Sequence, residues 1–391
     1  MIDRPVFLGY RRPDGRVGVR NFVLVVPTVI CAAVVSERIT AVAPDQIAAL
    51  PHLAGCGQLG PDMHVTHATL SAYCRHPNVG AVLVVALGCE QVVAQMLADA
   101  AEEAGKPSAI LAIQDVGGTV RTIERGRAIA ARMVDQLADM PRERCDVREL
   151  LLCLKCGGSD YTSGLASNPA LGRVADRLID LGGAAVLGEI AEIMGAEHLL
   201  AARAASPSAG AQLLRVVNRV EAEAMALGLD IRGTQPSPGN IRGGLTTIEE
   251  KSLGATHKAG ERTRLVDVVA YAAPISKPGL TVMDTPGLDV ESVTGMVGGG
   301  AQVVLFTTGL GTPTGNPIAP VIKITGNART ATSMADNTDI DVSGVLADAE
   351  SFESAAERVF SDLIEVSSGR PTAAERLGHR EFAIHRRNPT F

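Results

Sequence analysis

Basic residues are scarce in this chain of 391 residues. Its 36 Lys and Arg residues are outnumbered by 43 Asp and Glu residues, which gives a formal net charge of −7. No local run of basic residues compensates for this deficit, although proteins that grip the phosphate backbone normally carry a basic patch. The charge balance therefore argues against a general nucleic-acid binder.

Long apolar runs are lacking as well. The longest, Phe22–Val35, is about 14 residues and contains Pro27, whereas a helix that crosses a bilayer needs roughly 20 residues. Asp3 and Arg4 follow Met1 in place of a signal-peptide pattern. We expect no membrane segment and a cytoplasmic protein.

Cysteine is absent beyond residue 156. The chain has seven, at Cys31, Cys56, Cys74, Cys89, Cys145, Cys153 and Cys156. An odd number in a large chain argues against a secreted disulfide framework, and it favours a reducing compartment in which thiols remain free for metal binding or catalysis.

What the chain does have is a hydrophobic content of 46%, enough for a sizeable core. Apolar runs predict strands at 22–26, 47–53, 81–87 and 109–113, with helices near 31–42, 62–75, 90–104 and 118–139 between them. Continuous apolar runs are typical of parallel strands that are covered on both faces. We predict an α/β fold in which a doubly wound, mostly parallel, Rossmann-like sheet domain spans residues 1–145.

A second α/β domain, rich in glycine loops and carrying the catalytic or substrate groups, is expected over residues 146–391. Its loops lie at 156–160, 239–244, 298–300 and 306–315, around a helical stretch at 208–227. Glycine allows backbone amides to approach a ligand closely, so such loops often carry sites. The polar tail from about Arg370 is expected to pack loosely.

Two thiols follow predicted strands in the first domain. Cys56 comes after the run that ends at Leu53, and Cys89 after the run that ends at Leu87. Ligands of parallel sheets bind beyond the carboxyl ends of the strands. A single cysteine could equally be a small buried hydrophobe, but two in equivalent loops favour a site.

Metal-binding side chains accompany these thiols. His52 lies four residues before Cys56, and Glu90 follows Cys89 where a helix is expected to begin and its dipole to stabilise a thiolate. Imidazole and thiolate suit Fe(II), Mn(II) or Zn(II). Together with Cys156, the two loop cysteines could hold a mononuclear metal or an iron–sulfur cluster with one open position.

Three later segments concentrate polar groups. Residues 155–164 combine a cation, a thiol, hydroxyls and a carboxylate, including Ser159 and Asp160, although a turn with a helix cap would explain part of this. Residues 239–254 carry Arg242 and lead to His257. The loop at 306–315 lacks both nucleotide-binding patterns, so a carboxylate-binding role fits it better.

These motifs, in their order and spacing, resemble the altronate and galactarate dehydratases. The matching segments are 9–21, 52–57, 88–90, 156–164 with Asn168 and Pro169, 239–254 and 306–315. The resemblance spans nearly the whole chain. It implies a metal-dependent lyase, usually activated by Fe(II), that removes water from a sugar acid and leaves a 2-keto-3-deoxy acid.

Such a dehydration needs a base, a metal or cations that stabilise an enediolate, and an acid for the leaving hydroxyl. The metal candidates are Cys56, Cys89 and Cys156, with His52 and Glu90. The candidate bases and acids are Lys251, His257, Lys258 and Asp160. The candidates for substrate binding are Ser159, Arg242, Thr307, Thr308 and Gly309.

The chain departs from the family pattern in two ways. It begins almost directly at the 9–21 motif, without the small N-terminal domain of full-length relatives, and Leu310 stands where the family commonly has Arg. A separate small subunit could replace that domain, as in the similar large subunit of sulfolactate sulfo-lyase, which expels sulfite and is the alternative function. A non-catalytic relative that binds sugar acids is a third reading. We expect a small anionic hydroxy-acid substrate and a homo-oligomer.

Overall fold

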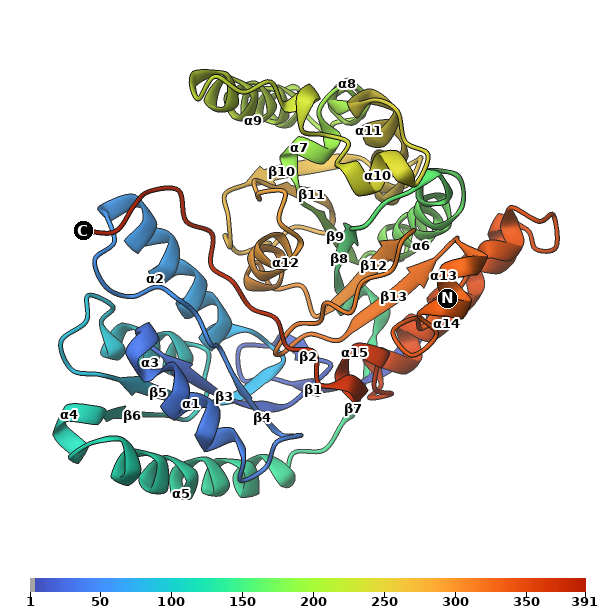
Figure 1. The fold of residues 1–391 in the computed structure, drawn as a ribbon. Helices are drawn as coiled ribbons and strands as arrows, with labels where there is room; N and C mark the ends of the chain where they lie inside the picture. The colour runs from blue at the N-terminus through green and yellow to red at the C-terminus, as the bar shows by residue number, and fades with distance from the viewer. Residues whose placement is uncertain (1–3) are drawn as a thin grey trace.

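The computed structural model describes residues 4–391, which form three β-sheets (Figure 1). Two of the sheets are parallel, with strand orders β4-β3-β5-β6 and β10-β11-β9-β8-β12-β13-β14, and the third has the order β2-β1-β7. The predicted α/β class with mostly parallel sheets is confirmed.

The four-stranded sheet is the doubly wound unit predicted for the first part of the chain. Its strands are β3 (Phe22–Pro27), β4 (Ile47–Ala49), β5 (Val79–Ala86) and β6 (Ser108–Ala112). Its main helices are α1 (Ala33–Thr40), α2 (Gly60–Arg75), α3 (Ala94–Glu103) and α5 (Thr119–Ala138). Helices α1 and α5 pack on one face and α2 and α3 on the other, which is why the strands are apolar throughout.

Two predicted boundaries in this unit were wrong. Strand β4 ends at Ala49 and not near Leu53, because the chain turns away into the loop that carries Cys56. Helix α3 begins at Ala94 and not at residue 90. The Glu90 carboxylate accepts hydrogen bonds from the N–H groups of Gly88 and Cys89 and closes a turn before the helix. Cys89 therefore does not lie at a helix N-terminus.

The seven-stranded sheet organises the second part of the chain. Its strands are β8 (Leu151–Cys156), β9 (Ala184–Leu187), β10 (Leu265–Val269), β11 (Gly279–Met283), β12 (Val303–Thr308), β13 (Val321–Thr325) and β14 (Ile340–Asp341). The helices used below are α6 (Asn168–Asp180), α7 (Ile190–Ile193), α9 (Pro207–Ala226), α10 (Pro238–Arg242), α11 (Ile248–Thr256), α12 (Asp289–Gly298), α14 (Phe352–Ser367) and α15 (Ala373–Leu377). The helix predicted at 208–227 is confirmed as α9.

The small antiparallel sheet was not predicted. Strand β1 (Val6–Arg11) pairs with β2 (Val17–Gly18) on one side and with β7 (Glu143–Asp146) on the other. The pairing of β1 with β7 joins residues more than 130 positions apart, so no local pattern could reveal it.

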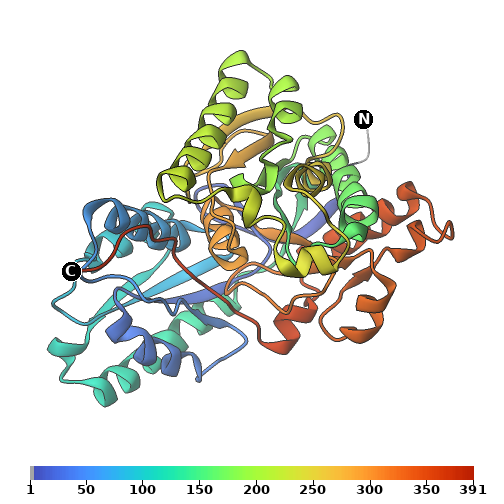
Figure 2. The ribbon, with the colours of Figure 1, turned by 45° about the horizontal axis from the view of Figure 1, so that its top comes forward.

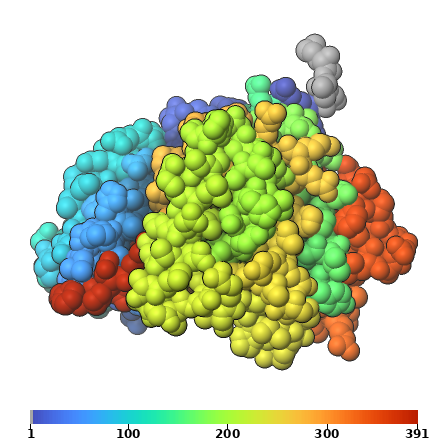
Figure 3. Space-filling model, turned by 90° about the horizontal axis from the view of Figure 1, so that it is seen from above, coloured from blue at the N-terminus to red at the C-terminus, as the bar shows by residue number. Residues whose placement is uncertain are grey.

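The polar tail does not pack loosely, contrary to expectation. Phe382 packs edge-on against Tyr73, with ring centroids 5.0 Å apart, and the backbone N–H of Arg387 donates to Asp62 in α2. The backbone N–H of Phe391 donates to the carbonyl of Gly57. Figure 2 shows this red segment running from α15 to its end beside α2, and Figure 3 shows its last part against the blue atoms of the first unit. The tail thus ties the two parallel-sheet units together.

No helix within residues 4–391 combines the length and the apolar character that a bilayer crossing requires.

Candidate active site

The carboxyl end of β8 is the switch point of the seven-stranded sheet. From β8 the chain moves to β9 on one side, and the later strand β12 lies on the other side. Open parallel sheets bind ligands at such points because the loops diverge there. Cys156 is the last residue of β8 and is in register with Thr307 of β12. Thr307 and Thr308 therefore lie at the end of a strand and not in a loop.

A triangle of hydrogen bonds surrounds the Cys156 thiol, which is 1% exposed. The Nζ of Lys258 donates to Cys156 Sγ over 2.8 Å and to Glu192 Oε2 over 2.6 Å. Cys156 Sγ donates to Glu192 Oε1 over 2.8 Å. A thiol, an ammonium and a carboxylate from three separate elements thus share one buried proton network.

The electrostatics of this network follow from burial and pairing. Burial, with the carboxylate of Glu192, raises the pKa of Cys156 to about 11. Burial alone would lower the pKa of Lys258, but the charges of Cys156 and Glu192 hold it above its ordinary value. Burial alone would raise the pKa of Glu192, but Lys258 and Lys155 keep it well below its ordinary range. At neutral pH the network is a thiol, an ammonium and a carboxylate.

A second buried ion pair lies directly behind the first. Lys155 Nζ donates to Glu189 Oε2 over 2.5 Å and lies 2.6 Å from Asp289 Oδ1. Burial and repulsion from Glu192 raise the pKa of Glu189, and the attraction of Lys155 opposes this shift. Glu189 immediately precedes the short helix α7 and Glu192 lies within it, so one short segment carries a carboxylate of each ion pair.

A cavity of about 230 Å³ opens in front of Cys156. Side chains that could contact a ligand there belong to Cys156, Ser159, Asn168, Lys251 and His257. Lys251 Nζ donates to Gln235 Oε1 over 2.7 Å. The structure therefore brings several of the predicted groups to one cavity. Lys258 does not line the cavity, but it contacts Cys156, which does.

Asp160 also borders this cavity, but its carboxylate is fully engaged by the surrounding loops. It accepts hydrogen bonds from Thr162 Oγ1 at 2.6 Å, from the N–H of Ser163 at 3.1 Å and from Asn327 Nδ2 at 2.7 Å. A Cβ atom at Gly309 would lie 2.0 Å from Asp160 Oδ1, so only glycine permits this approach. The carboxylate of Asp160, packed against Gly309, therefore connects the surrounding loops.

Asn168 connects the end of β12 to the thiol. Thr307 Oγ1 donates to Asn168 Oδ1 over 2.5 Å, and Asn168 Nδ2 lies 4.0 Å from Cys156 Sγ. Thr308 Oγ1 accepts from the N–H of Gly311 at 2.9 Å. The hydroxyls of Thr307 and Thr308 thus contact neighbouring groups of the chain, neither residue borders the cavity, and their role in binding a carboxylate stays a prediction. Arg242 is exposed at the end of α10 and does not border the cavity.

Residues 147–390 match the family model described as D-galactarate/altronate dehydratase, C-terminal. Residues 9–138 match the model described as D-galactarate dehydratase/altronate hydrolase, second domain. The chain belongs to the galactarate/altronate dehydratase family.

Curated relatives of this family differ in length. The beta subunit of (2R)-sulfolactate sulfo-lyase from Chromohalobacter salexigens is 39% identical over 97% of both chains. Altronate dehydratase from Bacillus subtilis is 36% identical over 98% of this chain and 78% of its own length. Galactarate dehydratase from Escherichia coli is 31% identical over 97% of this chain and 76% of its own length.

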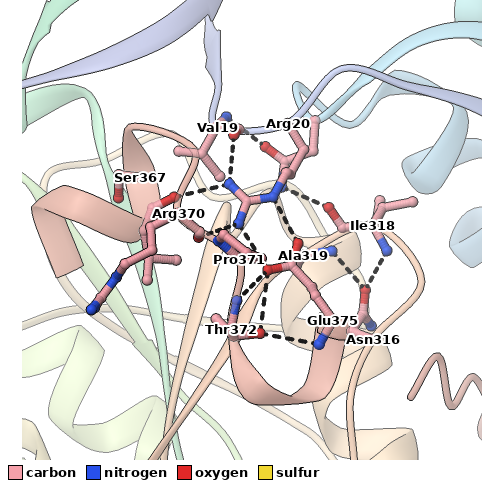
Figure 4. Close-up of polar contacts among 12 residues, drawn as sticks. Val19, Arg20, Asn316, Ile318, Ala319, Ser367, Arg370, Pro371, Thr372 and Glu375 are labelled. Atoms are coloured by element: carbon pink, nitrogen blue, oxygen red, sulfur yellow. Dashed lines mark hydrogen bonds and ion pairs between the residues drawn. The ribbon is translucent and has the colours of Figure 1, made fainter. Parts of the chain in front are cut away.

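One family motif, residues 9–21, lies away from the cavity and joins the two units. The guanidinium of Arg20 donates to both carboxylate oxygens of Glu375, over 2.7 and 2.8 Å, and to the carbonyls of Val366 and Arg370 (Figure 4). Arg20 precedes β3, whereas its partners lie in and around α14 and α15. This buried cation clamps the two ends of the chain together.

The other predicted metal ligands lie at the four-stranded sheet. His52 Nε2 contacts the Pro27 carbonyl at 2.8 Å and its Nδ1 accepts from the N–H of Ala54 at 3.2 Å, so both ring nitrogens are engaged. Burial lowers the pKa of His52. The thiols of Cys56 and Cys89 are exposed. Over residues 4–391, no group of three or more His, Cys, Asp and Glu side chains is placed to hold a metal ion.

The two loops that carry these exposed thiols are neighbours, since the N–H of Gln91 donates to the carbonyl of Gly55. Cys31 is exposed as well. Cys156 belongs to the other sheet and is closed in by Lys258 and Glu192. The predicted donor set is therefore not assembled in this arrangement.

Sequence reasoning missed Glu189, Glu192 and Asp289. A usable signal was present, because Glu189 and Glu192 follow strand β9 directly at a spacing of three, which places two carboxylates on one side of a helical turn. Asp289 opens helix α12, and its position suggests an ordinary acidic first turn.

Proposed function

We propose that this chain is a lyase that removes water from a small sugar acid, such as altronate or galactarate, and leaves a 2-keto-3-deoxy acid. Membership of the family supports this assignment. The observation that carries it is the Cys156 thiol, which borders a cavity while it is hydrogen-bonded to both Lys258 and Glu192. Such a network can move a proton to and from a bound substrate.

The proposed dehydration uses the thiolate of Cys156, which forms when the thiol loses its proton to water in the cavity and which the ammonium of Lys258 stabilises. The ionised Glu192 orients the thiol and the ammonium, and Lys251 regains its proton from water after the reaction. The thiolate takes the proton on the carbon next to the substrate carboxylate. Lys251, which borders the cavity, protonates the hydroxyl that leaves from the next carbon. The C–H and C–O bonds break, one water departs, and the resulting enol tautomerises to the 2-keto acid.

A divalent metal, Fe(II) above all, stays a prediction of the family resemblance. At the cavity, the side chains of Cys156 and Glu192 offer two donors, and Lys258 already supplies a positive charge to both. This donor set does not fit a mononuclear metal or an iron–sulfur cluster while Lys258 is in place, so no step above is routed through one. Metal analysis of anaerobically purified protein tests the prediction, and a stoichiometric metal would require a different set of ligands.

The test of the lyase proposal is an assay with altronate and galactarate that measures formation of a 2-keto acid. Replacing Cys156 with Ser should lower kcat by about 100-fold or more, because the general base is lost. The substitution Cys153→Ser is the matched control, since Cys153 is buried in the same strand and its thiol faces Met296. Full activity of the Cys156→Ser variant would reject the mechanism.

A second candidate, the sulfo-lyase reaction on (2R)-sulfolactate, is favoured by one comparison. The chain covers 97% of the sulfo-lyase beta subunit but only 76–79% of the dehydratases. The same proton network would serve, with sulfite in place of water as the leaving group. Sulfite release, measured with and without a co-encoded small protein, separates the two reactions. Binding of a sugar acid without any turnover would instead favour a non-catalytic relative.

The proposal also includes a separate small subunit, a homo-oligomer and a cytoplasmic location. Co-purification from the native organism tests the first, and the mass of the purified protein in solution tests the second. Cell fractionation tests the third.

A further inference from the structure

We propose that Lys155 is a positioning residue that holds the carboxylate of Glu192 against the Cys156 thiol. The proposed reaction uses Cys156, Glu192 and Lys258 but assigns nothing to Lys155, although Lys155 is 1% exposed and carries a charge. The inference rests on the proposed function for its kinetic readout only. Its structural readout is independent of any activity.

The ammonium of Lys155 has three acceptors, each in a different part of the site. Glu189 precedes α7, and Asp289 begins α12. The third acceptor is the carbonyl oxygen of Cys156, the last residue of β8, which lies 2.5 Å from Lys155 Nζ. The ammonium thus donates two hydrogen bonds and forms an ion pair with Asp289. One buried cation therefore fixes the end of the strand that carries the thiol relative to two helices.

The position of Glu189 explains why this cation matters for Glu192. Glu189 has a φ of 65°, a left-handed conformation that a residue with a side chain adopts only when its surroundings enforce it. Its N–H donates to Thr285 Oγ1 over 2.6 Å, and its carboxylate is held by Lys155. This turn sets the direction of α7, and Glu192 lies three residues further on.

Asp289 adds a second constraint on the same strand end. A Cβ atom at Gly157 would lie 2.5 Å from Asp289 Oδ2, so the carboxylate presses against the backbone directly after Cys156. Without Lys155, the carboxylates of Glu189 and Asp289 would be left close together without their shared cation. We expect the left-handed turn to relax and Glu192 to move away from the thiol.

The test is the substitution Lys155→Met. We expect kcat to fall by about 100-fold and KM to change by less than about threefold, because a small displacement of a catalytic contact affects the chemical step more than binding. The matched control is Lys106→Met. Lys106 is also buried, in the other unit, where its Nζ donates to the carbonyls of Cys74 and His76. This control should keep the kcat of the parent protein.

The second readout is alkylation of Cys156 by iodoacetamide at pH 7.5, located by peptide mass analysis. In the parent protein the thiol is enclosed by Lys258 and Glu192, so it should react slowly. Release of Glu192 should make it react about tenfold faster in Lys155→Met, but not in Lys106→Met. Because this rate needs no substrate, it decides the role of Lys155 even if none of the tested acids is turned over.

A folded Lys155→Met variant with the parent kcat and the parent alkylation rate would overturn the inference. If that variant does not fold, Asp289→Asn carries the test, since it removes one charge partner and keeps the shape of the side chain. Asp289→Asn should lower kcat and raise the alkylation rate, as Lys155→Met does, but by a smaller factor. Parent values of both in Asp289→Asn would then overturn the inference.

Discussion

Replacement of Lys258 by Met gives the sharpest test of the buried proton network. Lys258 and Glu192 are 1% and 4% exposed, and Nζ and Oε2 are 2.6 Å apart. The substitution keeps most of the side-chain volume but leaves the Glu192 carboxylate buried without its cation. Breaking a buried pair in this way destabilises a protein by about 3–5 kcal/mol, so we expect a loss of that size at pH 8.

The loss of unfolding free energy in Lys258→Met should depend on pH, and the direction of this dependence follows from the titration of Glu192. In the parent protein the pKa of Glu192 is held well below its ordinary value, so the pair contributes stability at neutral pH and loses it only in strong acid. In the variant, burial without Lys258 should raise the pKa of Glu192 above its ordinary value. Lower pH then protonates the buried carboxylate, and the difference from the parent should shrink between pH 8 and pH 5.

Urea unfolding of both proteins at pH 8, 7, 6 and 5 measures this difference. The matched control is Lys277→Met, which removes an exposed ion pair with Asp267 at a similar distance of 2.7 Å and should cost less than about 1 kcal/mol at every pH. A loss below about 1 kcal/mol for Lys258→Met, or one that does not vary with pH, would refute the reasoning.

Three further changes have clear expected outcomes. Arg20→Met should cost about 3–5 kcal/mol in urea unfolding, because it removes the cation from a partly buried carboxylate and one donor from each of two carbonyls; a loss under 1 kcal/mol would contradict the clamp. Gly309→Ala should lower both Tm and kcat, since its Cβ would lie 2.0 Å from a carboxylate oxygen, whereas Gly60→Ala has nothing within 4 Å and should be neutral. Cys56→Ser and Cys89→Ser, analysed for bound metal, test the predicted ligands; unchanged metal content in both would exclude these thiols as ligands.

The strands of the four-stranded sheet could be recognised from sequence because their environment is simple. A strand that is covered on both faces needs apolar residues throughout, so β3 and β5 appear as continuous apolar runs. The glycine-rich stretch after Cys156 was also recognisable as a site, because it combines polar side chains with glycines that let backbone amides approach a ligand. The residues that hydrogen-bond to the Cys156 thiol could not be recognised from the sequence.

Local sequence by itself determined the strands of the first sheet, the glycine-rich polar loop that begins at Cys156, and the family to which the motifs belong. Only the tertiary structure decided what each polar side chain does. His52 is engaged by the Pro27 carbonyl, 25 residues away, and Cys156 meets Lys258, 102 residues away. Secondary structure depends on a periodicity that short segments carry, whereas a buried polar group must find its partner wherever the fold provides one.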